Sequence, residues 1–124
     1  MSTAQTATLY ERLGGEEGIA TIVRTFYDRV LNDPLLQPFF RHTDMKRQRR
    51  HQTQFLIYAT GGAPRYTGAT MKKAHEGLGI RHRHFDAVLH HLADALRHHH
   101  VEEEVIAEIT KRLEPLRAEV VEAE

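Results

Sequence analysis

The 124-residue sequence contains no cysteine. This absence excludes disulfide bonds, thiolate nucleophiles and thiolate-ligated metal sites. Long apolar runs are also absent, because no stretch approaches the roughly 20 residues that a membrane-spanning helix needs. Residues 1–8 show no signal-peptide pattern, since they carry no charged group and no apolar core. We therefore expect a soluble cytoplasmic protein with no membrane partner.

An excess of charge of either sign is missing too, since 17 lysines and arginines balance 17 aspartates and glutamates. This balance argues against a protein that coats nucleic acid. The length suffices for one domain with a hydrophobic core, and no repeat or linker divides it. We predict a single domain over residues 1–124, with 1–8 and 118–124 loosely ordered. Histidine, by contrast, occurs ten times, and histidine is the commonest protein ligand for metals.

Apolar residues recur at steps of three and four along most of the chain, and no strand-like alternation appears. This pattern predicts an all-α fold. The predicted helices cover residues 9–13, 16–31, 45–59, 81–99 and 102 onward, with a short apolar segment at 35–40. Thr43 or Asp44 can cap the third helix. Pro115 should kink or divide the last one, because proline donates no backbone hydrogen bond.

The helix predicted over residues 45–59 has an unusual composition. Gln48, His51, Gln52 and Phe55 follow one another at steps of three and four, so they share one face. A helix that covers a core normally buries leucine, isoleucine and valine there. Two amides, an imidazole and a ring indicate instead the wall of a ligand pocket, which is apolar with a few hydrogen-bonding groups. The alternative is a polar, solvated face.

Two aromatic features also permit two interpretations. Tyr27 lies on the apolar face of the helix at 16–31, where a buried hydroxyl needs a hydrogen-bond partner. That partner is a backbone carbonyl if Tyr27 belongs to the core, and a ligand if it lines a pocket. Phe39 and Phe40 either fill the core or form an aromatic wedge against a flat ligand.

A second unusual stretch, residues 66–80, places His75 in a very short predicted helix. Glycines bound this helix on both sides, and Thr70 can cap it. A helix this short is marginal by itself, so something must hold it in place. We infer that His75 is a ligand of a haem iron. A haem needs one axial imidazole, apolar and aromatic walls, and control of the opposite iron face by hydrogen-bond donors.

The remaining histidines suggest a competing hypothesis. His82, His84, His90 and His91 lie mostly off the apolar stripe of the helix at 81–99, and we expect them to be exposed. The run His98–His100 precedes glutamates 102–104 by four residues each, a spacing that can place two ligands on one helix face. A non-haem metal-binding helical bundle is therefore an alternative, although Val101 should interrupt the helix there.

In order and spacing, several segments together resemble one known family, the group I truncated haemoglobins, which are short globins with a two-over-two helical sandwich. The segments that carry the resemblance are Leu9–Gly15, Phe26–Leu31, Phe39-Phe40, Asp44-Met45, Gln52, Phe55, Gly61-Gly62, Tyr66–Gly68, Met71, Ala74-His75 and His84–Asp86. Each segment by itself is a weak signal. Together they cover essentially residues 9–115 and imply a truncated globin-like two-over-two sandwich with a very short proximal helix.

The resemblance implies a role for each matching residue. His75 corresponds to the proximal histidine that ligates iron, and Tyr27 to the distal tyrosine that bonds iron-bound oxygen. Gln48 and Gln52 correspond to the two amides that complete this network. His51 matches a position where cyanobacterial members carry a histidine able to bind iron from the distal side. The implied haem-contacting set also includes Phe40, Phe55, Tyr66, Met71, Phe85 and Lys72, with Lys72, and less certainly Arg47 and Arg50, pairing with the haem propionates.

One position departs from the family. Some cyanobacterial members carry a histidine just after a proline in the last helix, and it bonds covalently to a haem vinyl group. Here the residue two positions after Pro115 is Arg117. We therefore expect non-covalent haem b.

The resemblance implies a haem protein that binds O2, NO and CO reversibly. Donors at Tyr27 and the glutamines should slow O2 release, which suits removal of nitric oxide as nitrate better than simple oxygen transport. Such turnover would need a reductase, which the sequence does not identify. We expect a monomer or weak dimer. A haem-based ligand sensor is a further alternative, and its output would need a separate partner.

Overall fold

The structure, a computed structural model, describes residues 7–66, 68 and 70–122. All of its regular elements are helices within that part of the chain. They are α1 (Leu9–Arg12), α2 (Gly15–Leu31), η2 (Gln37–Phe40), α3 (Met45–Ala59), α4 (Met71–His75), α5 (His82–His98), α6 (Glu103–Leu113), η3 (Glu114–Leu116) and α7 (Arg117–Val120). The all-α prediction is confirmed. No helix in these ranges is long and apolar enough to cross a membrane.

Side-chain caps explain where several helices begin. Asp44 accepts hydrogen bonds from the backbone N–H groups of Lys46 and Arg47, so α3 starts at a predicted cap. Thr70 accepts one from the N–H of Lys73 and starts α4 in the same way. These bonds satisfy N–H groups that have no partner inside the helix.

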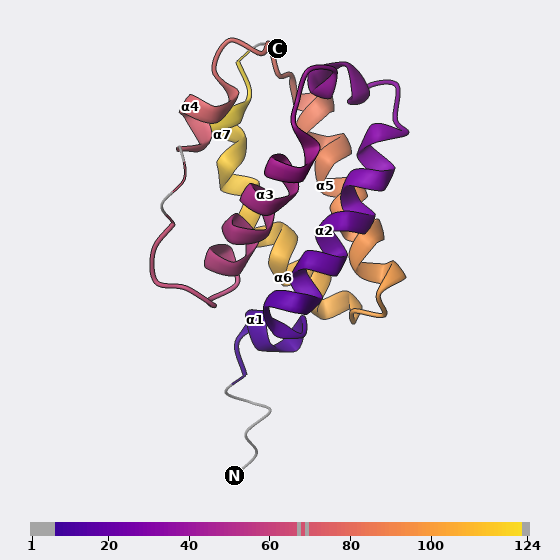
Figure 1. The fold of residues 1–124 in the computed structure, drawn as a ribbon. Coiled ribbons are helices and arrows are strands. Elements are labelled where there is room, and N and C mark those ends of the chain that lie inside the picture. The colour runs from indigo at the N-terminus through magenta and orange to yellow at the C-terminus, as the bar shows by residue number, and fades with distance from the viewer. Residues whose placement is uncertain (1–6, 67, 69, 123–124) are drawn as a thin grey trace.

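The core lies where α2 crosses its neighbours. α2 packs against both α3 and α5, and α5 packs against α6 (Figure 1). Most buried apolar side chains of these four helices belong to one cluster, which includes Ile19, Val23, Val30, Leu96 and Ile109. α4 contacts this cluster through Met71 and packs beside α7, so the two shortest α-helices in the second half of the chain share one corner (Figure 1).

The end of the described chain is more ordered than the sequence predicts. Pro115 lies in η3 and divides α6 from α7, as expected. Residues 118–120 are helical rather than loose, and Val120 is buried against Ile80 and Phe85. Within the other predicted loose segment, Thr8 caps α1 through a capping box with Glu11. Residues 1–6 and 123–124 lie outside the described residues.

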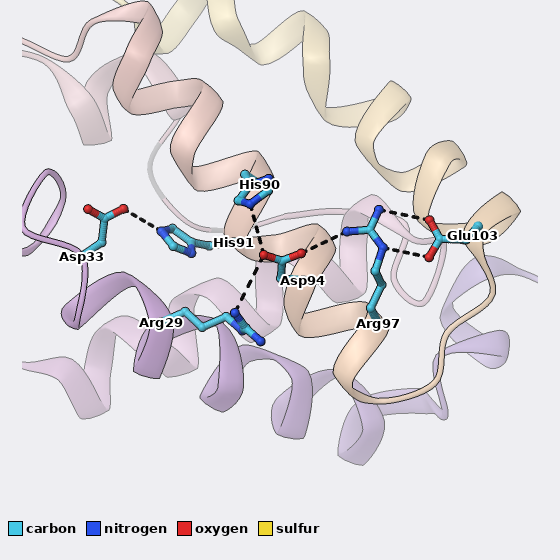
Figure 2. Close-up of polar contacts among 7 residues, drawn as sticks. All are labelled: Arg29, Asp33, His90, His91, Asp94, Arg97 and Glu103. Carbon is cyan, nitrogen blue, oxygen red and sulfur yellow. Dashed lines mark hydrogen bonds and ion pairs between the residues drawn. The ribbon is translucent and has the colours of Figure 1, made fainter.

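Two of the histidines expected at the surface are not exposed. His84 is buried because its ring packs edge-on against Phe39 and its Nδ1 accepts the backbone N–H of Arg81. His91 is half-buried because its Nε2 lies 2.7 Å from a carboxylate oxygen of Asp33 (Figure 2). His84 contacts Phe39 and the cap of its own helix, and His91 contacts Asp33, far away in the sequence. The helical periodicity of a sequence does not report such contacts.

Candidate functional site

Tyr27 and Gln48 are hydrogen-bonded across the α2–α3 interface. The amide Nε2 of Gln48 donates to the hydroxyl oxygen of Tyr27 at 3.0 Å. Tyr27 is 3% exposed, and within the described residues its own hydroxyl proton has no acceptor. A buried donor without an acceptor is costly unless a ligand or water completes the bond. The pair therefore presents one O–H group that is ready to donate to a bound molecule.

The electrostatics keep this donor protonated. Burial raises the pKa of Tyr27 to about 12, while the hydrogen bond from Gln48 and the nearby charge of Arg49 lower that pKa in part. The phenol is therefore neutral at physiological pH. Arg49 is a residue that the sequence analysis missed, because its helical position says nothing about its distance from α2.

Two pairs of aromatic rings consist of predicted site residues. The Phe40 ring, from η2, meets the Tyr27 ring edge-on with centroids 5.8 Å apart. Phe55 is buried on α3, and its ring meets the Tyr66 ring at 5.4 Å. Phe40 and Tyr66 are only partly buried although both pack against the core. These half-covered rings provide an apolar surface for a flat ligand.

The imidazole of His75 is oriented by its own helix. Its Nδ1 lies 2.7 Å from the carbonyl oxygen of Met71, one turn earlier in α4. A carbonyl only accepts, so the proton resides on Nδ1 and the lone pair of Nε2 is free for a metal. His75 is half-buried, and Met71 packs against both apolar clusters of the protein. The donor set thus fits a group that needs one imidazole ligand.

Phe85 belongs to the smaller apolar cluster, in α5. It is 7% exposed and packs with Ile80 and Val120, to which Met71 also adds contacts. The guanidinium of Arg117 lies 4.6 Å from the centroid of the Phe85 ring. Phe85 and Met71 therefore connect α4 to the rest of the fold.

Five of the predicted residues have side chains that no hydrogen bond, ion pair or ring contact joins to the described part of the chain. Gln52 is half-buried on α3, and the other four are exposed. They are Gln52, His51, Lys72, Arg47 and Arg50. The exposure of His51 differs from the buried pocket wall that its helical spacing suggests, whereas Gln48, Gln52 and Phe55 are all at least half-buried.

The alternative metal site near residues 98–104 is not formed. Across the ranges that the structure describes, no group of three or more His, Cys, Asp or Glu side chains could hold a metal ion. His99 instead bonds the hydroxyl of Thr25 through Nε2 at 2.7 Å, and Glu103 pairs with Arg97. Within this run, His99 therefore serves a contact between the end of α5 and α2.

Residues 8–122 match the sequence profile of the family described as bacterial-like globin. A group 1 truncated hemoglobin of Mycolicibacterium paratuberculosis is 43% identical over 98% of this chain and 89% of its own length. A crystal structure of the truncated hemoglobin from Tetrahymena pyriformis, in the Fe(III) form, has a TM-score of 0.90 and 38% identity, and the match covers 94% of this chain and 100% of that one.

A third similar structure bears on the cofactor. The 2/2 hemoglobin from Synechococcus, solved with covalently attached heme, has a TM-score of 0.85 and 36% identity over 91% of this chain and 95% of that chain. The helix order and the two packed helix pairs of this chain are thus those of a two-over-two sandwich. The chain belongs to the bacterial-like globin family, among the group 1 truncated haemoglobins, and is a haem protein that binds small gaseous ligands.

Proposed function

We propose that the chain holds haem b non-covalently, that His75 would ligate its iron, and that Tyr27, Gln48 and Gln52 would lie beside the bound gaseous ligand. The observation that carries this proposal is the hydrogen bond from His75 Nδ1 to the Met71 carbonyl. It fixes the tautomer in which Nε2 can coordinate iron, and it stiffens the ring. When bound, the haem supplies a ferrous iron that takes O2, NO or CO and can convert O2 and NO together into nitrate.

The chain's own residues then determine how long the ligand stays. Gln48 donates to the Tyr27 oxygen, so the single hydroxyl proton of Tyr27 stays available for another acceptor. A hydrogen bond to a partly charged acceptor is worth roughly 1.5–3 kcal/mol. That energy slows ligand release by about ten- to a hundred-fold. The slow release favours removal of nitric oxide over oxygen transport.

A bound haem would be covered by apolar side chains, which would keep water away from the Tyr27 hydroxyl. The wall residues contribute rings and a thioether, which are Phe40, Phe55, Tyr66, Met71 and Phe85. In dry surroundings each hydrogen bond is electrostatically stronger. Lys72, Arg47 and Arg50 have no ion pair within the described residues, so their charges are available to the two haem propionates.

Two observations support non-covalent attachment. The sequence has no cysteine for a thioether, and Arg117 stands where some members carry a covalently linked histidine. The Arg117 guanidinium is held by Glu114 and Asp86 and lies over the Phe85 ring. Acid extraction should therefore remove all haem from the protein.

We also propose a redox partner and a cellular location for this protein. Nitrate formation consumes one electron per cycle, so a reductase must return the iron to the ferrous state. We propose a cytoplasmic monomer or weak dimer, with residues 1–124 forming one haem domain.

Absorbance spectra of the protein with added haemin test this function. We expect a sharp Soret band that shifts on reduction with dithionite and again on addition of CO. A single broad visible band in the reduced, unliganded form indicates an open ligand side governed by Tyr27 and Gln48. Split visible bands indicate that His51 moves from the surface onto the iron, which lowers apparent affinity by the fraction of protein so blocked. A spectrum equal to that of free haemin contradicts the proposal.

A further inference from the structure

A carboxylate far away in the sequence binds the turn that follows His75. Glu122 accepts a hydrogen bond from the backbone N–H of Gly77 through Oε2 and from that of Gly79 through Oε1, each at 2.9 Å. The backbone N–H of Glu122 also donates to the carbonyl of Ile80 at 2.9 Å. Three hydrogen bonds therefore tie residues 77–80 to residue 122, and we name this set the carboxylate clasp.

The turn is built to receive an anion. Gly77 and Gly79 have φ angles of +82° and +69°, a left-handed conformation that residues with a side chain rarely adopt. No atom lies within 4 Å of a Cβ placed on either residue, so the backbone conformation, and not space, requires glycine. N–H groups in such turns converge into a concavity that favours negative charge.

The clasp lies at the end of α4, where a hydrogen bond of 3.3 Å from the N–H of Leu78 to the carbonyl of His75 also closes the turn. At its beginning, α4 has the Thr70 cap and the packed side chain of Met71. At its end, Glu76 is already extended and makes no helix-capping bond. His75 is the last helical residue, so the direction of its imidazole depends on how residues 76–80 are anchored. The hydrogen bond to the Met71 carbonyl orients the ring relative to α4, but a five-residue helix is marginal by itself, so its end must also be held.

The charges agree with this arrangement. The N–H groups of Gly77 and Gly79 hold the pKa of Glu122 below its ordinary range. The carboxylate is thus ionised at neutral pH. Because both bonds go to backbone N–H groups, any substitution at Leu78 leaves them in place, whereas a change at Glu122 removes them.

We propose that Glu122 is a positioning residue for His75. It fixes the end of α4, and with it the angle at which the imidazole meets the haem iron. This proposal rests on the proposed role of His75 as the axial ligand.

The test compares Glu122→Ala and Glu122→Gln with Glu119→Ala in the haem-loaded protein. Glu119 is an exposed carboxylate of α7 without a side-chain contact among the described residues, so it controls for loss of charge. The first measurement is amide hydrogen exchange at Gly77 and Gly79. Glu122→Ala should speed exchange at both by about ten-fold, and Glu122→Gln, which keeps one acceptor oxygen, by less. Glu119→Ala should leave both rates unchanged.

The second measurement is the iron–histidine stretching band in the resonance Raman spectrum of the ferrous, unliganded form. Glu122→Ala should shift or broaden this band, with partial recovery in Glu122→Gln. An unchanged band together with unchanged glycine exchange overturns the clasp. A wild-type protein with a Soret band but no iron–histidine band overturns the role of His75 itself, so the two failures are distinguishable.

Discussion

Tyr27 is the residue whose environment is most specialised. It is buried, it accepts a hydrogen bond from Gln48, and its own proton has no acceptor among the described residues. A core tyrosine bonded to a backbone carbonyl, which is the plainer interpretation of its position, would use that proton. The Tyr27 proton without an acceptor therefore favours a ligand-binding role for this hydroxyl.

Substitution of Tyr27 by phenylalanine should speed O2 release by about ten- to a hundred-fold, because it removes one hydrogen bond to a charged acceptor. Stopped-flow displacement of O2 by CO measures this rate. Tyr58→Phe is the matched control, since Tyr58 is exposed and its hydroxyl has no hydrogen bond within the described ranges. Equal release rates for Tyr27→Phe and the wild type would contradict the account of the ligand side.

The same hydroxyl predicts an alkaline loss of stability. The pKa of Tyr27 is about 12 in the folded protein and 10.0 as the ordinary value, so the unfolded chain loses its proton first. The stabilisation is complete below pH 10 and declines as pH rises toward 12, by at most about 3 kcal/mol. Urea unfolding measured at steps through this range should show the decline in wild type. Tyr27→Phe should not show this loss of stability. If the unfolding free energies of the two proteins fall in parallel with pH, titration of Tyr27 is not the cause.

At the scale of elements, the end of α1 and the start of α2 lie too close together for a side chain on Gly18. A Cβ on Gly18 would lie 1.9 Å from the carbonyl oxygen of Leu13, because α1 folds back across the first turn of α2. An alanine in a helix is ordinarily more favourable than glycine by about 1 kcal/mol. Here the clash is with backbone, which cannot rotate away.

Gly18→Ala should therefore destabilise the protein by about 1–3 kcal/mol instead of stabilising it. Thermal unfolding followed by circular dichroism measures the change. Glu17→Ala, an exposed neighbour in the same turn, should alter stability by only a few tenths of a kcal/mol. A higher melting temperature for Gly18→Ala than for wild type would show that α1 does not pack there.

A polar network joins α2, α5 and α6 on one side of the molecule. Asp94 of α5 pairs with Arg29 of α2 and with Arg97, and Arg97 pairs with Glu103 of α6 (Figure 2). Beside it, Asp33 bonds His91, so the turn after α2 is attached to α5. Exposed pairs of this kind contribute little each, and the half-buried Asp33–His91 pair should contribute most.

Asp33→Asn should lower the melting temperature by about 2–4 °C at neutral pH. The hydrogen bond from His91 holds the pKa of Asp33 below its ordinary value, helped by the backbone N–H of Leu35. The stabilisation by the Asp33 carboxylate is therefore present above its pKa in the unfolded chain. It is lost as pH falls through the lower pKa that Asp33 has in the folded protein. Melting curves from pH 7 downward should converge for Asp33→Asn and wild type, whereas Asp28→Asn should match wild type throughout. A constant difference at all pH values would exclude the ion pair as its cause.

At the scale of the whole molecule, the sequence predicts local elements well and long-range contacts poorly. The helices at 15–31 and 45–59 begin and end within a residue of the predicted bounds, because periodicity, caps and Pro34 are local signals. The very short helix around His75 points to a haem ligand, whereas the role of Tyr27 on the ligand side is implied only by the family resemblance. The burial of His84, the proximity of Arg49 to Tyr27 and the Glu122 bond to the glycine turn depend on contacts between distant segments, and no local pattern reports them.

The central claim is that His75 holds the haem iron, and substitution of His75 by glycine tests it most directly. The ferrous spectrum of His75→Gly, reconstituted with haemin and reduced, should lose the wild-type Soret and visible bands. Free imidazole at millimolar concentration should restore them by occupying the vacated position. A His75→Gly protein whose ferrous and CO-bound spectra equal those of wild type without imidazole would contradict the account, since the iron would then have another axial ligand.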